Sequence, residues 1–171
     1  MAQSTLRGTS GRLLGALAAI CVVVSSAIVS VSAQAAPTLV VLVRHAERAD
    51  VPGDDAPISE IGQARARALA AALADANVTA VVTSSRRRTT ETAQPLLDAR
   101  RLTAEIISVA DGVEAQVAGV VAAVRRHQRG LVLVVGHSNT VSAIVHALGG
   151  PQLDDLCDNA FATMFVMELA P

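Results

Sequence analysis

The sequence contains no tryptophan, no tyrosine and no lysine, and aromatic residues make up only 1% of its 171 residues. So few aromatic side chains leave almost nothing on which nucleic-acid bases could stack. Fourteen basic residues against fifteen acidic ones give a formal net charge of −1, so there is no overall positive field to attract a phosphate backbone. These absences argue against a nucleic-acid-binding protein. A hydrophobic content of 51% with 17% charged residues excludes an intrinsically disordered chain, and the length predicts one domain.

The N-terminal segment has the layout of an export signal. Basic residues without any acid precede a nearly uninterrupted apolar stretch at residues 13–31, and the small residues of the sequence AQA, which ends at Ala35, provide a cleavage site. We therefore expect residues 1–35 to be a signal peptide and residues 36–171 to be an exported domain, either periplasmic or secreted. An uncleaved membrane anchor is the alternative, because about 20 apolar residues in a helix match the thickness of a bilayer core.

The mature domain must be stabilised by its hydrophobic core, because Cys157 is its only cysteine and no internal disulfide can form. Short aliphatic and β-branched runs alternate along it with stretches of helical periodicity. The predicted strands are residues 38–44, 79–83, 104–109, 131–135 and 163–169, and the predicted helices are residues 59–75, 87–100, 113–127 and 140–148. This alternation predicts an α/β fold, a three-layer α/β/α sandwich with a mostly parallel sheet and helices on both faces.

Three polar clusters directly follow predicted strands. They are Arg44-His45 after the first strand, Ser84 to Arg88 after the second and His137-Ser138-Asn139 after the fourth. Because ligand sites of open α/β sheets lie beyond the carboxyl ends of the strands, we expect these side chains to meet there. Arginine side chains and free N–H groups at helix amino termini bind small anions, above all phosphate. One imidazole can then attack phosphorus and carry the phosphoryl group, while the arginines and the other imidazole bind its oxygens.

The same clusters resemble the motifs of a known family. The motifs are LVRHAE at residues 42–47, SSRRRTTETA at residues 84–93 and VVGHSNT at residues 134–140. In this order, each after a strand, they are similar to the motifs of the histidine phosphatase superfamily, which has the phosphoglycerate mutase-like fold, and the resemblance spans residues 38–169.

The resemblance implies a phosphoric monoester hydrolase that needs no cofactor and no metal. It implies that His45 is the nucleophile that accepts the phosphoryl group. It also implies that Arg44, Arg88 and His137 bind the phosphate. Ser138 and Asn139 are further candidates for substrate binding. Other arginines of the second motif, at positions 86 and 87, do not align with the family's arginine and are interpreted as solvent-exposed.

The motifs do not identify the general acid that protonates the leaving group. Ser138 stands where the acid-phosphatase branch of the family has an aspartate, so the proton donor of that branch is missing. The remaining candidates are the carboxylates Glu114, Asp111 and Glu47, of which we prefer Glu114 as the general acid.

Three other interpretations are weaker. The sequence GHSNT resembles the nucleophile elbow of serine hydrolases with Ser138 as the nucleophile, but the only later histidine, His146, precedes Asp154, which is the wrong order for that fold. The acidic residues around Asp154 lack the spacing of a metal site. A phosphate-binding module of the same fold without turnover is the alternative outside enzymology.

We therefore predict a metal-independent phosphatase that hydrolyses phosphomonoesters through a phosphohistidine intermediate on His45. A protein phosphohistidine phosphatase is the alternative activity, although the predicted export disfavours it. The expected partner is a small phosphorylated substrate. We expect no nucleic-acid partner, and we expect contact with a membrane only through an uncleaved N-terminal segment.

Overall fold

The computed structural model describes Met1 and residues 37–170. The predicted signal peptide and its cleavage site at Ala35 lie outside the described residues, so both remain predictions. Within the described part of the chain, no helix has the length and apolar composition to cross a membrane.

The described residues form one five-stranded sheet. Its strands are β1 (Thr38–Arg44), β2 (Val78–Ser84), β3 (Glu105–Ile107), β4 (Gly130–Gly136) and β5 (Met164–Leu169). They lie in the order β3-β2-β4-β1-β5. The first four strands along the chain pair in parallel, whereas β5 pairs with β1 in the antiparallel direction at the edge of the sheet. The sheet is therefore mostly parallel, as the sequence predicts.

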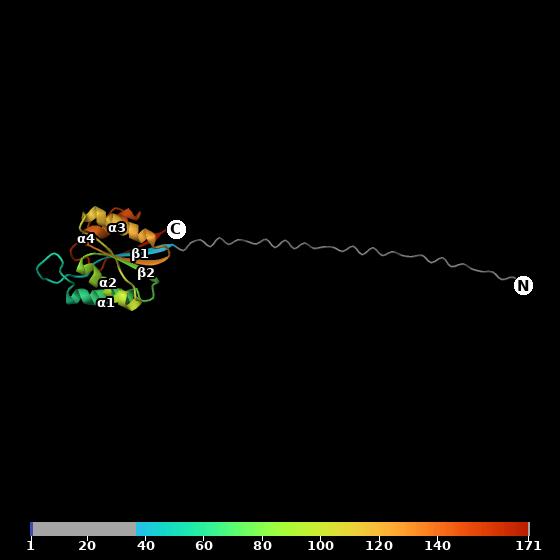
Figure 1. Ribbon diagram of the computed structural model, residues 1–171, viewed down its shortest axis with the longest axis horizontal. Coiled ribbons are helices and arrows are strands. Elements are labelled where there is room, and N and C mark those ends of the chain that lie inside the picture. Colours follow the sequence, from blue (N-terminus) through green and yellow to red (C-terminus); the bar gives the residue numbers. More distant parts are fainter. Residues whose placement is uncertain (2–36, 171) are drawn as a thin grey trace. The chain divides into compact units, whose positions relative to one another are not determined.

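Four helices in the described residues cover this sheet. They are α1 (Glu60–Ala72), α2 (Arg87–Arg100), α3 (Gly112–Arg126) and α4 (Ser138–Ala147). Figure 1 shows α1 and α2 on one face of the sheet and α3 and α4 on the other, which confirms the predicted three-layer sandwich. The largest difference from the predicted bounds is in α1, which ends at Ala72, where Leu73 caps it, rather than at Asp75.

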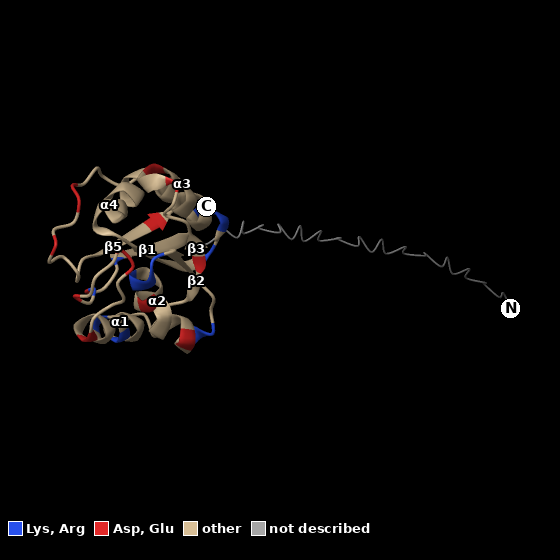
Figure 2. Ribbon diagram, turned by 60° about the vertical axis from the view of Figure 1, so that its left-hand side comes forward, with Lys and Arg blue, Asp and Glu red and all other residues tan. Residues whose placement is uncertain are grey.

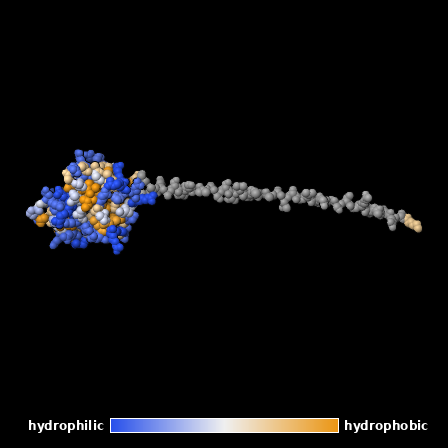
Figure 3. All heavy atoms as spheres, viewed as in Figure 1, coloured by the Kyte–Doolittle hydropathy of each residue, from blue (hydrophilic) through white to orange (hydrophobic). Residues whose placement is uncertain are grey.

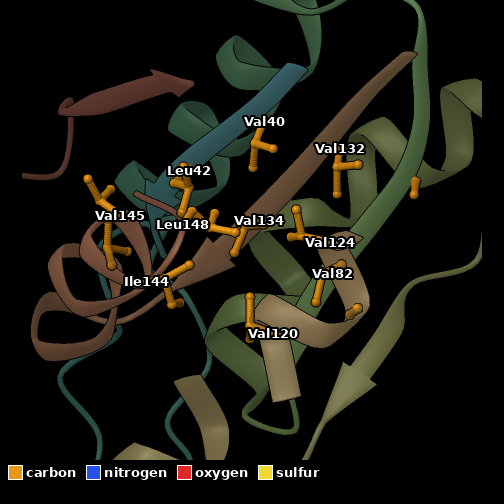
Figure 4. Close-up of a cluster of buried hydrophobic side chains, with 13 residues drawn as sticks. Val40, Leu42, Val82, Val120, Val124, Val132, Val134, Ile144, Val145 and Leu148 are labelled. Atoms are coloured by element: carbon orange, nitrogen blue, oxygen red, sulfur yellow. The ribbon is translucent and has the colours of Figure 1, made fainter. Parts of the chain in front are cut away.

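The hydrophobic core lies on both faces of the sheet. Strands covered by helices on both sides consist of nearly continuous aliphatic residues, which explains the runs LVVLV and LVLVV in β1 and β4. Figure 4 shows the cluster between the sheet and the α3–α4 layer, which includes Val40, Leu42, Val134, Val124 and Ile144. A second cluster packs the opposite face of the sheet against α2. Hydrophilic residues interspersed with hydrophobic ones cover the face seen in Figure 3. The packed strands hold their carboxyl ends, and the side chains that follow them, in fixed positions.

Candidate active site

The backbone holds the side chain of His45, which follows β1, in one orientation. The His45 N–H donates to the carbonyl oxygen of Gly136 at the end of β4, at 2.9 Å. Nδ1 of the ring lies 2.8 Å from the carbonyl oxygen of Ala46. Because a carbonyl oxygen can only accept, Nδ1 carries the proton and the lone pair of the ring is on Nε2.

The imidazole of His45 is also kept uncharged. The residue is 5% exposed, and this burial lowers its pKa to about 4, with the positive charge of Arg88 acting in the same direction. At neutral pH the ring is therefore neutral, and Nε2 can act as a nucleophile. Nε of Arg88 donates to this lone pair of Nε2 at 3.1 Å, so the guanidinium lies where a phosphoryl group would attach and gives up this hydrogen bond when Nε2 attacks.

Thr92 links the loop that carries His45 to α2 through two hydrogen bonds. The N–H of Ala46 donates to Oγ1 of Thr92 at 2.9 Å, and the Thr92 hydroxyl donates to the carbonyl oxygen of Arg88 at 2.6 Å. Thr92 thus fixes the loop of the nucleophile relative to the first turn of α2, a positioning role that the sequence did not predict. The signal was its spacing of four residues from Arg88, which places the two on the same side of a helix.

The guanidinium of Arg44 is fixed by the loop before β5. Its Nη1 donates to the carbonyl oxygens of Cys157 and Asp158, at 2.8 Å and 3.0 Å. Its central carbon lies 4.3 Å from the ring centre of Phe161, which is the geometry of a cation–π contact. Burial lowers the pKa of Arg44 and of Arg88 from the ordinary arginine value, yet both remain positively charged at neutral pH.

His137 brings the second imidazole to the site from the end of β4. The rings of His45 and His137 are 5.3 Å apart between their centres, inclined at 65°. Nε2 of His137 is 2.9 Å from Oγ of Ser84, which also lies 2.8 Å from Oγ1 of Thr89 and accepts from the N–H of Arg86 at 3.2 Å. Burial, followed by the charge of Arg88, lowers the pKa of His137 to about 3.

Two buried nitrogen atoms of the site, Arg44 Nε and His137 Nδ1, have no hydrogen-bond partner among the described residues. A buried donor without a partner costs about 1–3 kcal/mol, a cost that an oxygen of a bound anion can offset.

A cavity of about 560 Å³ opens beside both imidazoles. All the predicted site residues except Glu114 line it, namely Arg44, His45, Arg88, His137, Ser138 and Asn139. The carboxyl ends of β1, β2 and β4 thus bring the three polar clusters together at one edge of the sheet. The walls of the cavity also include Arg48, Arg86, Gln116 and Phe161, which the sequence did not place there.

The preferred acid, Glu114, does not reach this cavity. It is exposed and lines a different cavity, between the outer surfaces of α3 and α4. Residues two apart on a helix point about 200° apart. The neighbour of Glu114 that faces the imidazoles is therefore Gln116, which is 5% exposed.

The other candidate acids also lie elsewhere. Asp111 is exposed at the start of α3 and does not line the cavity. Glu47 is bound by Arg65, whose Nε and Nη2 donate to its carboxylate at 2.6–3.0 Å, and this pairing lowers the pKa of Glu47. Among the described residues, no aspartate or glutamate lines the cavity of His45.

Comparisons with known proteins agree with the motifs and the fold. The family model of the histidine phosphatase superfamily (branch 1) matches residues 40–108, which include the first two motifs. A protein from Nakamurella multipartitia named phosphohistidine phosphatase SixA is 26% identical, with a TM-score of 0.55 over 79% of this chain and 86% of that chain. Its namesake from Agrobacterium tumefaciens is 27% identical, with a TM-score of 0.50 over 66% of this chain and 77% of that chain.

A mycobacterial glucosyl-3-phosphoglycerate phosphatase shares the fold. It is 19% identical, with a TM-score of 0.53 over 66% of this chain and 79% of that chain. None of the curated protein sequences matches this chain. The solved relatives thus combine one phosphoglycerate mutase-like fold with phosphatases of different substrates.

Proposed function

Since the chain belongs to the histidine phosphatase superfamily, we propose that it is a metal-independent phosphatase that hydrolyses phosphomonoesters through a phosphohistidine on His45. One observation carries the proposal. The hydrogen bond from Nδ1 of His45 to the carbonyl oxygen of Ala46 leaves the lone pair on Nε2, beside Arg88 and at the cavity.

In the first step, Nε2 of His45 attacks the phosphorus atom of the substrate. The bond from phosphorus to the ester oxygen breaks, and this oxygen leaves with the electron pair and takes up a proton. The imidazole becomes positively charged as the phosphoryl group attaches, and the carbonyl of Ala46, which accepts from Nδ1, stabilises that charge. Arg44, Arg88 and His137 bind the oxygens of the transferred group.

In the second step, water attacks the phosphorus atom of the phosphohistidine. The phosphorus–nitrogen bond breaks, Nε2 recovers its lone pair, and inorganic phosphate leaves. The positive charge that a metal ion supplies in other phosphatases comes here from guanidinium groups, which suit phosphate oxygens in both charge and geometry.

A second candidate function is hydrolysis of phosphohistidine in proteins. The observation that favours it is the lack of a carboxylate at the cavity among the described residues, because an imidazole leaving group takes up its proton more readily than an alcohol does. The similarity to two proteins named as SixA phosphohistidine phosphatases supports the same candidate. A phosphohistidine peptide compared with an alkyl phosphate as substrate separates the two candidates.

The test is phosphate release by the purified protein from an aryl phosphate in excess EDTA. We expect turnover in EDTA, and we expect His45→Ala to abolish it while the folded structure is retained. His127→Ala is the matched control, since His127 lies after α3, away from the cavity. Rapid quench in a neutral denaturing detergent should trap labelled phosphate on the protein as an adduct that is then lost in acid and retained in base. Activity that persists in His45→Ala, or a base-labile adduct on Ser138, would overturn the mechanism.

A further inference from the structure

The cavity of His45 contains more positive charge than one phosphoryl group requires. Arg44 and Arg88 already lie beside the nucleophile, and the proposed mechanism assigns them to the transferred group. Arg48, in the loop after β1, and Arg86, just before α2, line the same cavity. Both are close enough to Arg88 to affect its ionisation. Burial lowers the pKa of Arg88 most, and the positive charges of Arg86 and Arg48 lower it further.

The side chains of these two additional arginines form no ion pair with any described residue, whereas Arg65, Arg87 and Arg126 each pair with a glutamate. Arg87, the neighbour of Arg86, donates to the carboxylate of Glu91 at 2.8 Å and 3.0 Å. Arg65 is bound to Glu47 in the same way. The guanidinium groups of Arg48 and Arg86 are therefore free to bind an anion in the cavity.

The nearest carboxylates do not neutralise this charge within the cavity. Asp54 and Asp55 lie in the loop before α1 and raise the pKa of Arg88. Oδ1 of Asp55 accepts the N–H of Arg87 at 2.8 Å, and neither aspartate lines the cavity. An anionic group additional to the transferred phosphoryl group is thus the natural ligand of Arg48 and Arg86.

The leaving group is restricted by a separate observation. No described carboxylate lines the cavity, and Gln116, which faces it from α3, has an amide that cannot supply a proton. An alcohol leaves poorly without a proton donor. A phosphate group, whose second pKa is about 6, leaves as a stable anion at neutral pH and needs no general acid.

Together these two observations define a substrate class. We propose that the phosphatase acts on phosphoanhydrides, removing the terminal phosphate of a diphosphate or triphosphate, and that Arg48 and Arg86 bind the phosphate that leaves. This inference rests on the proposed transfer to His45 and replaces the phosphomonoester of the proposed function by a phosphoanhydride as the preferred substrate. A phosphomonoester that also carries a carboxylate would satisfy the arginines, but its alcohol would still lack a proton donor.

The reaction balances without a further reactant. The bond from His45 Nε2 to the terminal phosphorus forms as the bond from that phosphorus to the bridging oxygen breaks. The bridging oxygen keeps the electron pair and leaves as part of the shortened phosphate, whose charge Arg48 and Arg86 stabilise. Water then cleaves the phosphorus–nitrogen bond to release inorganic phosphate, and the remaining proton of that water goes to solvent.

The experiment measures kcat/KM of the purified protein on three substrates: a nucleoside diphosphate, the matching nucleoside monophosphate and an aryl phosphate. We expect the diphosphate to exceed the monophosphate by about 100-fold or more, the size of a typical general-acid contribution. The double variant Arg48→Gln/Arg86→Gln should lower kcat/KM for the diphosphate by about 10- to 100-fold more than for the aryl phosphate, which has no second phosphate. Arg87→Gln is the matched control, and it should leave the ratio of the two substrates as in the wild type.

The outcomes separate the inference from the proposed function. Phosphate release from none of the three substrates would overturn both. Turnover of the aryl phosphate that depends on His45, with equal rates on the monophosphate and the diphosphate, would overturn the inference alone. An equal loss on aryl phosphate and diphosphate in the double variant would do the same.

Discussion

The two ends of the central sheet each have a cavity lined by arginine and histidine, but the two cavities differ in charge. At the carboxyl ends of β1 and β4, the cavity of about 560 Å³ is lined by His45 and His137 and by no described carboxylate. At the opposite end, a cavity of about 380 Å³ is lined by His127 and two arginines together with the carboxylate of Glu168. The chain has no lysine, so blue marks arginine in Figure 2. One blue segment lies beside the C-terminal end in that view.

Three basic residues near the amino ends of the strands, His127, Arg126 and Arg100, have side-chain partners. Nε2 of His127 lies 3.4 Å from a carboxylate oxygen of Glu105, and Arg126 forms an ion pair with the same residue. Arg100 donates to the carbonyl oxygens of Leu73 and Ala76, at 3.1 Å and 2.7 Å. The same residue types therefore stabilise the fold at one end and create an anion site at the other. The difference lies in the carboxylates: Glu105 pairs with His127 and Glu168 lines the cavity of His127, whereas no described carboxylate lines the cavity of His45.

The largest effect is expected from the replacement of one histidine at each end of the sheet, His137 at the carboxyl ends of the strands and His127 at the amino ends. His137→Ala removes a ring 5.3 Å from that of His45, and we expect kcat to fall by about 10²- to 10³-fold, as for the loss of one donor to a developing charge. His127→Ala, at the other end of the sheet, should retain kcat. The measurement is steady-state release of phosphate from an aryl phosphate. Equal losses in the two variants would break the comparison, because they would indicate general damage to the fold.

A smaller effect, and a gain, is expected at Gln116. Gln116→Glu places a carboxylic acid of nearly the same shape at the cavity that lacks one. A well-placed general acid contributes about 10²- to 10⁴-fold, and we expect about tenfold from one that has no tuned environment, seen as a higher kcat/KM for an alkyl phosphate. The gain should be smaller for an aryl phosphate, whose leaving group needs no proton.

Glu114→Gln is the matched control on the same helix. Glu114 faces away from the imidazoles, so its replacement should leave the ratio of alkyl to aryl turnover unaltered. A loss confined to the alkyl phosphate in Glu114→Gln would instead assign the proton donor to Glu114, and would show that α3 moves when substrate binds.

The contrast between Glu114 and Gln116 also shows what the sequence could predict. The aliphatic runs predicted the strands. Arg44, His45 and His137 were predicted as site residues because they stand where those runs end, and the residues at the carboxyl end of a parallel strand lie at the sheet edge where ligands bind. The face of α3 that looks toward the cavity was not predictable from its pattern. The valines at 113, 117, 120, 121 and 124 lie within an arc of about 100°, and Glu114 and Gln116 flank this arc on opposite sides, so the pattern does not indicate which of the two faces the cavity.

Residues placed by long-range contacts were missed for a different reason. Arg48 lies in a loop held by the hydrogen bond from Ile58 N–H to Glu91 of α2, and Phe161 reaches Arg44 across 117 positions of sequence. The hydrophobic periodicity of the sequence does not indicate contacts between residues so far apart along the chain. Arg86 was interpreted as solvent-exposed because it does not align with the family's arginine, whereas it is half-buried in the cavity wall. The export signal lies outside the described residues and stays a prediction.

The smallest predicted effect is the response of stability to mild acid. The fold lowers the pKa of His45 to about 4 and that of His137 to about 3, from an ordinary value of 6.5 that applies in the unfolded chain. Between these values the unfolded chain binds more protons, so the stability is fully present above about pH 6.5 and is lost as the pH falls toward 4. From about pH 7.5 to about pH 6, where carboxylates remain ionised, the loss is about 1 kcal/mol per histidine.

Thermal unfolding at these two pH values should therefore show a lower melting temperature at pH 6, by several degrees. His45→Gln removes one of the two neutral histidines, so the difference between the two pH values should shrink by about half even if the variant is less stable at both. The same difference in the wild type and in His45→Gln would mean that the nucleophile is not held neutral by its burial, and the distinction between the two ends of the sheet would then rest on the arginines alone.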